Sequence, residues 1–266
     1  MFYKDYFNKS VKSATEYKIR YLKYLLNDSS IYKFIQFNDN EEENLLKLQS
    51  LKNGTLWFSY YRYLNDPTEY KIEYNIRKTQ RNTNLSREEI EYLNGSMKEM
   101  YDVCCFSYKY NDYMWDIYAN DGNGLCIVFQ SLDLDMLYPI DYIEKKKIPF
   151  TNLIINSLNA LDEGIITNIP MAVLPFVVKN PMNGYLNSTK ENEIRMLYSF
   201  YSDKDITKGK LYPDIKMRSG YLGLNVPYDK VDLRLKKVII GSGCSLNLLE
   251  KIIEICEDND YDYEIK

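Results

Sequence analysis

Short runs of β-branched and aromatic residues alternate irregularly with longer segments whose apolar residues repeat at helical spacing. Such runs are typical of strands, and such segments of amphipathic helices. Because the alternation is irregular and no internal repeat occurs, the pattern favours an α+β fold with a curved, mainly antiparallel sheet and flanking helices over a doubly wound parallel sheet. We expect one domain over 1–266, made of an N-terminal helical element at 1–30 and an α+β core at 31–266.

Start and stop signals place the individual elements. "SREE" at Ser86 matches a capping box, which predicts that a helix begins there, and Asn53-Gly54 ends an earlier helix. Ser245 or a neighbour starts the last one. We expect strands at 31–37, 55–59, 102–107, 122–130, near 139–150 and 172–179, and at 236–241 and 261–265, and helices at 10–27, 38–54, from Ser86, near 112–119, at 153–162 and at 242–258.

The chain contains no histidine. This absence excludes Ser-His-Asp and Cys-His nucleophilic sites, general catalysis by histidine and nearly all catalytic zinc sites. The five cysteines include no C-x-x-C pair and mostly lie in or beside apolar segments, which is typical of small buried side chains in a reducing compartment. Any chemistry therefore has to use carboxylates, Lys, Arg, Tyr, Ser, Thr, Cys or backbone dipoles.

Charge and hydropathy narrow the class of protein. The net charge is −4 and no long basic block occurs, which argues against a primary role in nucleic-acid binding. The longest basic run, 144–148, is typical of a solvated strand end or loop. No apolar run reaches the roughly 18–20 residues that span a bilayer, and the N-terminus lacks the apolar core of a signal peptide. We expect a cytoplasmic protein that does not bind membranes.

"ENEIR" carries the first candidate site. On a strand with Ile194 and Met196 facing inward, Glu191, Glu193 and Arg195 would share the opposite face, because side chains repeat every two residues. One interpretation is a solvent face with balanced charge. The other is a cleft in which a carboxylate positions a sugar hydroxyl or stabilises an oxocarbenium-like cation.

The segment 106–124 carries the second candidate. If 112–119 is helical, Trp115 and Tyr118 lie on one side of the helix. They either anchor the helix to the core or form a wall on which a nicotinamide, adenine or other base stacks. Ser107, at the end of the preceding strand, could donate a hydrogen bond to such a ligand.

Two further segments suggest sites but have ordinary explanations. "IIGSGCSLN" at 239–247 matches neither phosphate-binding glycine motif, and a tight turn with a serine cap explains it. In "WFSYYRYLNDP" at 57–67, Arg62 and the Asn65-Asp66-Pro67 turn could face a ligand, although Asn-Asp-Pro is also a generic turn.

Taken together and in order, five segments resemble the bacterial family catalogued as domain of unknown function 2971. They are "IYKF", "LKNGTLWFSYYRYLNDPTEY", "CCFSYKYNDYMWDIYANDGNGLCIVF", "VVKN…ENEIRML" and "LKKVIIGSGCS", and they span about residues 31–245. The layout is also similar to that of the ADP-ribosyltransferase superfamily, in which a split antiparallel sheet surrounds an NAD cleft. This second resemblance is an analogy of layout.

The superfamily resemblance implies a role for each candidate. Tyr32 or Lys33 would take the first-strand position that contacts NAD, Ser107 the central position, and Glu193, with Glu191 two residues before it, the catalytic position. The lack of histidine leaves a variant of the Arg-Ser-Glu type, here without the first-strand arginine. Nicotinamide would lie near Ser107 and the second candidate segment.

Three functional hypotheses follow. The first is an NAD-consuming or ADP-ribosyl-transferring effector or toxin of a bacterial anti-phage defence or toxin–antitoxin system, with a protein or nucleic-acid acceptor and a regulatory partner protein. The second is a non-catalytic module of a defence system that binds a nucleotide or a protein. The third, a Mg²⁺-dependent nuclease or phosphodiesterase, needs clustered acids, and "DGNG" and "NDP" are too sparse, so we expect no metal.

Overall fold

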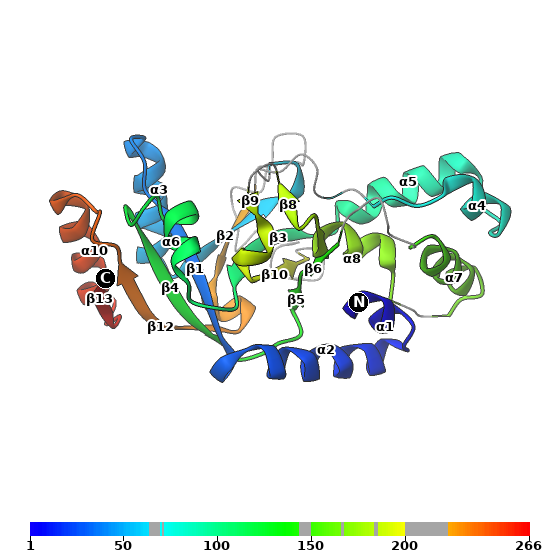
Figure 1. Cartoon of the computed structure of the whole chain (residues 1–266), viewed down its shortest axis with the longest axis horizontal. Helices are drawn as coiled ribbons and strands as arrows, with labels where there is room; N and C mark the ends of the chain where they lie inside the picture. The colour runs from blue at the N-terminus through cyan, green and yellow to red at the C-terminus, as the bar shows by residue number, and fades with distance from the viewer. Residues whose placement is uncertain (64–69, 71, 144–149, 166–167, 184–185, 200–222) are drawn as a thin grey trace.

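A long, largely antiparallel sheet is the centre of the protein in a computed structural model, which describes residues 1–63, 70, 72–143, 150–165, 168–183, 186–199 and 223–266 (Figure 1). The strand order is β11-β2-β3-β1-β4-β12-β13, and β10 pairs with β3 and β5. Only β12 and β13 run parallel among the described pairs of this sheet. The strands are β1 Ser30–Gln36, β2 Thr55–Tyr60, β3 Asp102–Ser107, β4 Gly124–Ser131, β5 Leu137–Pro139, β10 Glu193–Tyr198, β11 Gly223–Pro227, β12 Leu233–Ile240 and β13 Tyr263–Ile265.

The sheet divides at β3. One edge of β3 pairs with β10 along its whole length. The other edge is shared, because β2 pairs with it only at Val103 and Asp102, and β1 only where Tyr32 faces Ser107. The strands β1 and β2 therefore meet opposite ends of β3. The predicted α+β class and the mainly antiparallel sheet are confirmed.

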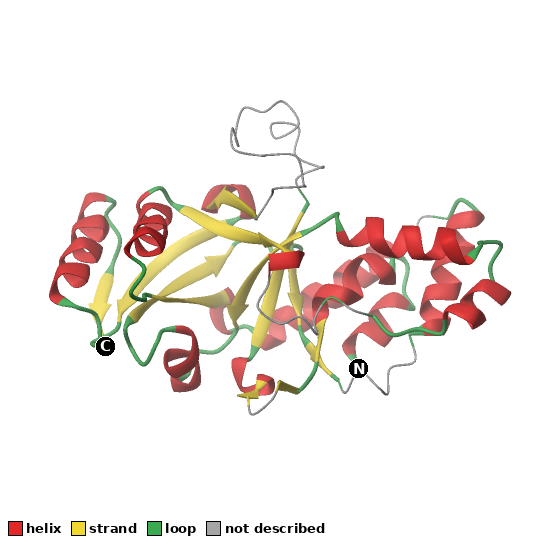
Figure 2. Cartoon of the chain, turned by 90° about the horizontal axis from the view of Figure 1, so that it is seen from above, coloured by secondary structure: helices red, strands yellow, loops and turns green. Residues whose placement is uncertain are grey.

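Helices cover the two faces unequally, as Figures 1 and 2 show. Helices α3 (Glu41–Lys52) and α10 (Leu246–Asp258) pack against one face, over a core that includes Phe58, Phe129 and Ile252. On the other face α6 (Asp112–Tyr118) covers β1, β4 and β12. A separate helical lobe packs beside β10 and consists of α1 Phe2–Phe7, α4 Ile76–Arg81, α5 Arg87–Lys98, α7 Thr151–Asp162 and α8 Pro170–Val177.

Helix α2 (Val11–Leu25) joins the two parts. Its Ala14 belongs to the core of the helical lobe, and its Leu22 belongs to the core beneath the sheet. The N-terminal element predicted at 1–30 is thus helical, and the aromatic side chains of α1, which the sequence analysis did not assign, bury it against β5 and the helical lobe.

Local signals explain most helix boundaries. Ser86 and Glu89 form the predicted capping box at the start of α5, and the hydroxyl of Ser245 accepts from the amide of Leu248 at the start of α10. The glycines that follow β12 allow close contact between two turns, since a Cβ on Gly241 would lie 2.0 Å from the carbonyl oxygen of Gly122. This confirms the tight turn with a serine cap.

In the middle of the chain one prediction was wrong and another was only partly right. The apolar run at 172–179 belongs mainly to α8, because a continuous apolar run does not distinguish a buried strand from a helix that is buried all round. Pro170 starts this helix. Near 139–150 the structure has only the end of β5 and the two-residue β6 (Asp141–Tyr142), while 144–149 lies outside the described residues. The other short strands are β7 Val178–Lys179, β8 Met182–Asn183 and β9 Leu186–Asn187.

Candidate functional site

Three of the predicted site residues form a row across three neighbouring strands. Tyr32 on β1 faces Ser107 on β3, and Ser107 faces Glu193 on β10. Residues that are directly opposite each other in a sheet share a face. The row therefore places an aromatic side chain, a hydroxyl and a carboxylate in line, between α6 on one side and the helical lobe on the other.

Glu191 joins this row from a different element. It ends the short helix η4 (Ser188–Glu191), and Asn192 then adopts the left-handed conformation at φ 48° before β10 begins at Glu193. The expectation that Glu191 and Glu193 alternate on one strand is therefore wrong. The turn at Asn192 brings both carboxylates to the same place.

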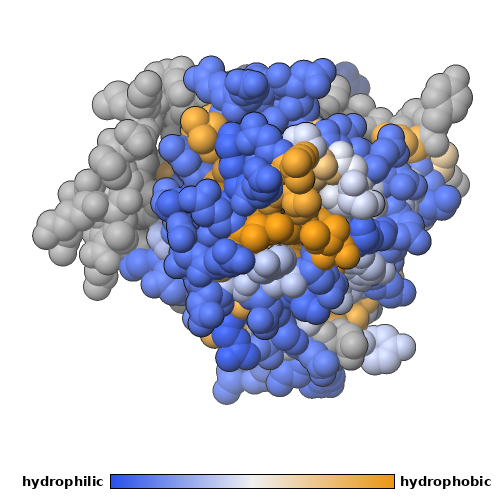
Figure 3. Space-filling view, turned by 90° about the vertical axis from the view of Figure 1, so that its left-hand side faces the viewer, coloured by the Kyte–Doolittle hydropathy of each residue, from blue (hydrophilic) through white to orange (hydrophobic). Residues whose placement is uncertain are grey.

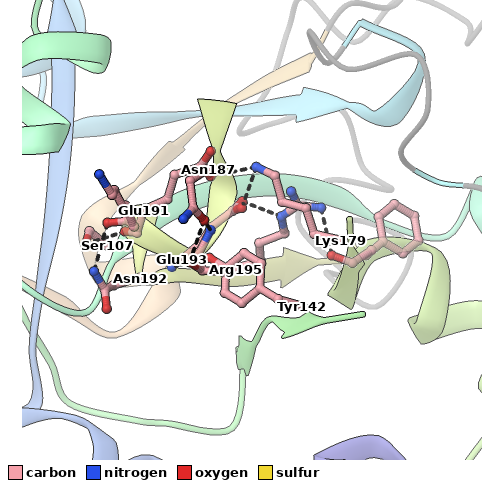
Figure 4. A network of polar contacts seen from close by, with 11 residues as sticks. Ser107, Tyr142, Lys179, Asn187, Glu191, Asn192, Glu193 and Arg195 are labelled. Carbon is pink, nitrogen blue, oxygen red and sulfur yellow. Dashed lines mark hydrogen bonds and ion pairs between the residues drawn. The ribbon is translucent and has the colours of Figure 1, made fainter. Parts of the chain in front are cut away.

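The two carboxylates meet at Lys179, which lies on β7 (Figure 4). Its ammonium is 2.6 Å from Oε2 of Glu191 and 3.0 Å from Oε2 of Glu193. The other oxygen of Glu193 accepts from Nε of Arg195 at 2.5 Å. Two negative and two positive side chains thus form one connected network.

The network is buried. Glu191 and Glu193 are each 5% exposed and Arg195 is 2% exposed, so the interpretation of these side chains as a solvent face is wrong. A buried ion pair loses its hydration, and only good geometry with further hydrogen bonds offsets that cost. Arg195 supplies one such bond, since its guanidinium also donates to the carbonyl of Phe176 on α8 at 2.8 Å.

Neutral groups fix the backbone around the carboxylates. The amide of Glu193 donates to the hydroxyl of Tyr142 at 2.9 Å. The fully buried hydroxyl of Ser107 lies 2.8 Å from the carbonyl oxygen of Glu191 and 2.7 Å from that of Lys109. A hydroxyl donates one hydrogen bond, so these two carbonyls share it. Ser107 therefore positions Glu191 through its main chain.

The surroundings of Glu191 and Glu193 shift the pKa values of the two carboxyl groups in opposite directions. Burial alone would raise the pKa of Glu193, but Arg195 and Lys179 hold that pKa well below its usual value. Burial raises the pKa of Glu191; Lys179 opposes the rise, and the charge of Glu193 adds to it. Such a split between neighbouring carboxyl groups is typical of acid–base pairs, although structural networks also produce it.

The aromatic candidates on α6 have different surroundings. Trp115 is 2% exposed and packs edge-on against Phe34 at 5.5 Å, which supports the anchoring role that the sequence left open. Tyr118 is 36% exposed, and its hydroxyl is close enough to Glu191 to lower the pKa of that carboxyl. Burial and the charge of Glu191 raise the pKa of Tyr118. Tyr118 thus reaches the carboxylates, whereas Trp115 lies behind it in the core.

The two first-strand candidates point to opposite faces. Tyr32 shares the face of Ser107 and packs against Tyr110, with ring centroids 5.9 Å apart. Lys33, the next residue, lies on the other face and donates to the carbonyl of Cys105 at 3.0 Å. Only Tyr32 therefore belongs to the row.

Sequence reasoning missed Lys179 and Tyr142. Lys179 follows an almost wholly apolar run that begins at Pro170. A lysine that ends such a buried segment needs a counter-charge, and this signal could have found it. Tyr142 gave no signal, because nothing in the sequence brings β6 beside β10.

The remaining expectations concern metal ligands, membrane-spanning helices, the cysteines and the segment around Arg62. No group of three or more potential metal ligands occurs among the described residues, and none of their helices is long and apolar enough to cross a bilayer. The five cysteines are free and buried or half-buried. Burial raises the pKa of Cys105, so its thiol stays protonated. The side chain of Arg62 and the Asn65-Asp66-Pro67 turn lie outside the described residues.

Comparison of this chain with protein-family models, with curated proteins and with solved structures found no match.

Proposed function

We propose that the protein is an NAD-utilising enzyme of the ADP-ribosyltransferase type. The observation that carries the proposal is the row of Tyr32, Ser107 and Glu193 across β1, β3 and β10, with Glu191 beside it. These are the first-strand, central-strand and late-strand positions that the resemblance in layout implies. The divided antiparallel sheet is consistent with this layout.

In this proposal the C1′–N bond between ribose and nicotinamide breaks, and the electron pair leaves with nicotinamide, which becomes neutral. The ribose is left as an oxocarbenium cation. Glu193, held ionised by Arg195 and Lys179, supplies the fixed negative charge that stabilises this cation. An acceptor nucleophile or water then bonds to C1′, and Glu191 takes its proton.

The raised pKa of Glu191 suits this second role. A general base works best when its pKa lies nearer the working pH than that of an ordinary carboxylate. In this proposal Tyr118, which is partly exposed and lowers the pKa of Glu191, contacts the acceptor. An effector or toxin role in a bacterial defence or toxin–antitoxin system, with a protein or nucleic-acid acceptor, is part of the proposal and rests on the analogy of layout with the ADP-ribosyltransferase superfamily.

One observation favours a second candidate, a non-catalytic binding module. Glu193 is buried and already neutralised by two cations, so its charge also has a structural use in joining β10 to β7 and α8. In that case the exposed aromatic side chains near α6 would recognise a nucleotide or a protein without chemistry.

The test is release of nicotinamide from NAD, measured by chromatography, with and without cell lysate as a source of acceptor. Wild-type protein should release nicotinamide, and Glu191→Gln and Glu193→Gln should each lower the rate by at least about a hundredfold. Glu88→Gln, at an exposed position on α5, is the matched control and should leave the rate unchanged. Wild-type inactivity under both conditions would leave only the binding module.

Loss of the Glu193 carboxylate also threatens the fold, because it removes the carboxylate that both Arg195 and Lys179 contact. The expectation that Gln is tolerated on an exposed strand face does not hold at this buried position. The double variant Glu193→Gln/Lys179→Met removes one charge of each sign, so the net charge of the network stays as in the wild type. If it unfolds at the wild-type temperature and still releases no nicotinamide, lost activity is not due to lost folding.

A further inference from the structure

An apolar patch, surrounded by hydrophilic side chains, lies near the middle of the end of the molecule that is farthest from the helical lobe (Figure 3). Helices α3 and α10 lie side by side there, and the ion pair between Lys52 and Asp258, 3.6 Å apart, joins their C-terminal ends. The patch consists of the exposed leucines of both helices and the half-buried side chains between them. Its members are Leu45, Leu46, Leu246, Leu249 and Ile253.

The exposure of these leucines is unusual for a monomer's surface. Leu246 is 71% exposed, Leu46 is 59% exposed and Leu45 is 55% exposed. Single exposed apolar residues are common, but a contiguous group on two adjacent helices marks a site of association. Leu249 and Ile253 also pack against the core beneath the sheet, so the core holds this part of the patch in place.

Acidic residues run alongside the apolar ones. Glu250 and Glu254 follow Leu246 at four-residue intervals on α10, and Glu42 precedes Leu46 by the same interval on α3. Like charges four residues apart destabilise a helix. None of these three glutamates forms an ion pair with a described residue. The repulsion is therefore uncompensated within the described part of the chain.

The negative charge of the whole protein is concentrated here. Helix α3 together with residues 246–266 carries ten carboxylates against four lysines, an excess of six negative charges. The whole chain has 38 acidic and 34 basic residues, an excess of only four. The remainder of the chain is thus slightly basic, and this one end is distinctly acidic.

We infer that the α3–α10 face binds a basic amphipathic helix of another protein. A helix lies naturally along two parallel helices, with apolar side chains at positions i, i+3, i+4 and i+7 against the leucines. Lysines or arginines at four-residue spacing would face Glu250 and Glu254. Because α3 and α10 cover the sheet face opposite to Glu193, this surface is independent of the candidate active site.

The probe is a fluorescein-labelled 15-residue peptide with leucine and lysine at helical spacing, and binding is measured by fluorescence anisotropy. We expect the wild type to bind it and to bind more weakly as salt rises. Glu250→Lys/Glu254→Lys should weaken binding by about tenfold, because two attractive contacts become repulsive. Leu45→Ser/Leu246→Ser should weaken it similarly.

Matched controls separate this surface from general attraction to an acidic protein. Glu88→Lys/Glu91→Lys on α5 changes the net charge equally, and Leu132→Ser removes a leucine that is 62% exposed elsewhere. Neither should alter binding. Equal weakening by the α5 variant, equal binding of a leucine–glutamate peptide, or no binding by the wild type would overturn the inference. So would a dimer in sedimentation equilibrium that Leu246→Ser dissociates, since the occupant would then be a second copy of this chain.

Discussion

The ammonium of Lys179 lies 2.6 Å from the carboxylate of Glu191. This contact joins β7, which belongs with the helical lobe, to η4, which leads into the sheet strand β10 (Figure 4). Because the same ammonium also reaches Glu193, one lysine holds together two carboxylates that lie on either side of the left-handed turn at Asn192. The lysine is therefore the centre of the site, although the run of residues that precedes it is apolar.

Replacement of Lys179 by Met should destabilise the protein by about 3–5 kcal/mol, because it removes the ammonium that both buried carboxylates contact. Urea unfolding followed by circular dichroism measures the change. At this chain length the same loss lowers Tm by roughly 6–20 °C.

A second substitution checks that charge, and not shape, is responsible. Lys179→Met/Glu191→Gln removes one charge of each sign and should regain most of the lost stability. If the double variant is as unstable as the single one, the lysine stabilises the protein through its packing and not through its charge.

Most of the fold was predictable because the sheet strands and the long helices carry local signals. The strand over 102–107, the capping box at Ser86 and the serine cap of α10 all occur as predicted. Helix α8 was mistaken for a strand because burial on every side removes the periodicity that identifies a helix. Strand β11 was missed because its five residues gain their order by pairing with β2, which is distant in sequence.

The pH dependence of stability should have two parts. The folded pKa of Glu193 is lowered, so its contribution is fully present above the unfolded value of about 4.3 and is lost as the pH falls through the folded pKa. The folded pKa of Glu191 is raised, so its contribution is fully present below about 4.3 and is lost as the pH rises through the folded pKa.

Urea unfolding of wild type and variants between about pH 3 and pH 7 tests both signs. Glu191→Gln should abolish the part of the stability gain that occurs as the pH falls from 7 toward 4.3, whereas Glu193→Gln should abolish part of the loss below it. The prediction fails if Glu191→Gln changes only the acidic limb, since Glu191 would then have a lowered pKa.

The site was only partly predictable. The glutamates were found because charged residues on an apolar strand pattern stand out, but their burial was not foreseen. Their partner Lys179 comes from another element, and the turn that brings Glu191 beside Glu193 depends on one residue, Asn192, whose conformation the spacing concealed. Strand periodicity applies only while the backbone stays extended.

The left-handed turn gives a direct test. Asn192→Gly should change stability by only a few tenths of a kcal/mol, because glycine adopts positive φ without strain. The one interaction lost is the hydrogen bond that the Asn192 side-chain amide donates to the carbonyl of Lys190. Asn192→Val should cost about 1–2 kcal/mol and separate Glu191 from Glu193. Thermal unfolding measures both variants, and equal tolerance of the two would show that the turn does not require this conformation.

Ser107 and Ser131 provide a matched pair. Each is buried at a strand end and donates to the carbonyl two residues later, at 2.7 Å, but only Ser107 also lies within reach of the Glu191 carbonyl. Ser107→Ala should cost about 1–3 kcal/mol and increase amide hydrogen exchange in η4. Ser131→Ala should lose a similar local bond and leave exchange in η4 unchanged. Equal exchange in η4 in the two variants would show that Ser107 does not position Glu191.

Tyr118 and Trp115 distinguish the two sides of α6. The Tyr118 hydroxyl lowers the pKa of Glu191, so Tyr118→Phe should raise that pKa further. Trp115 packs against the core and lies under the ammonium of Lys266, and its indole nitrogen has no hydrogen-bond partner among the described residues, so Trp115→Phe should leave the pKa of Glu191 unchanged. The side-chain carboxyl resonances of ¹³C-labelled glutamate, followed by NMR during a pH titration, report the pKa directly.

If nicotinamide is released, the acidic limb of the pH–rate profile should shift to higher pH in Tyr118→Phe alone. A shift of equal size in Trp115→Phe would mean that α6 acts on Glu191 through packing and not through the Tyr118 hydroxyl.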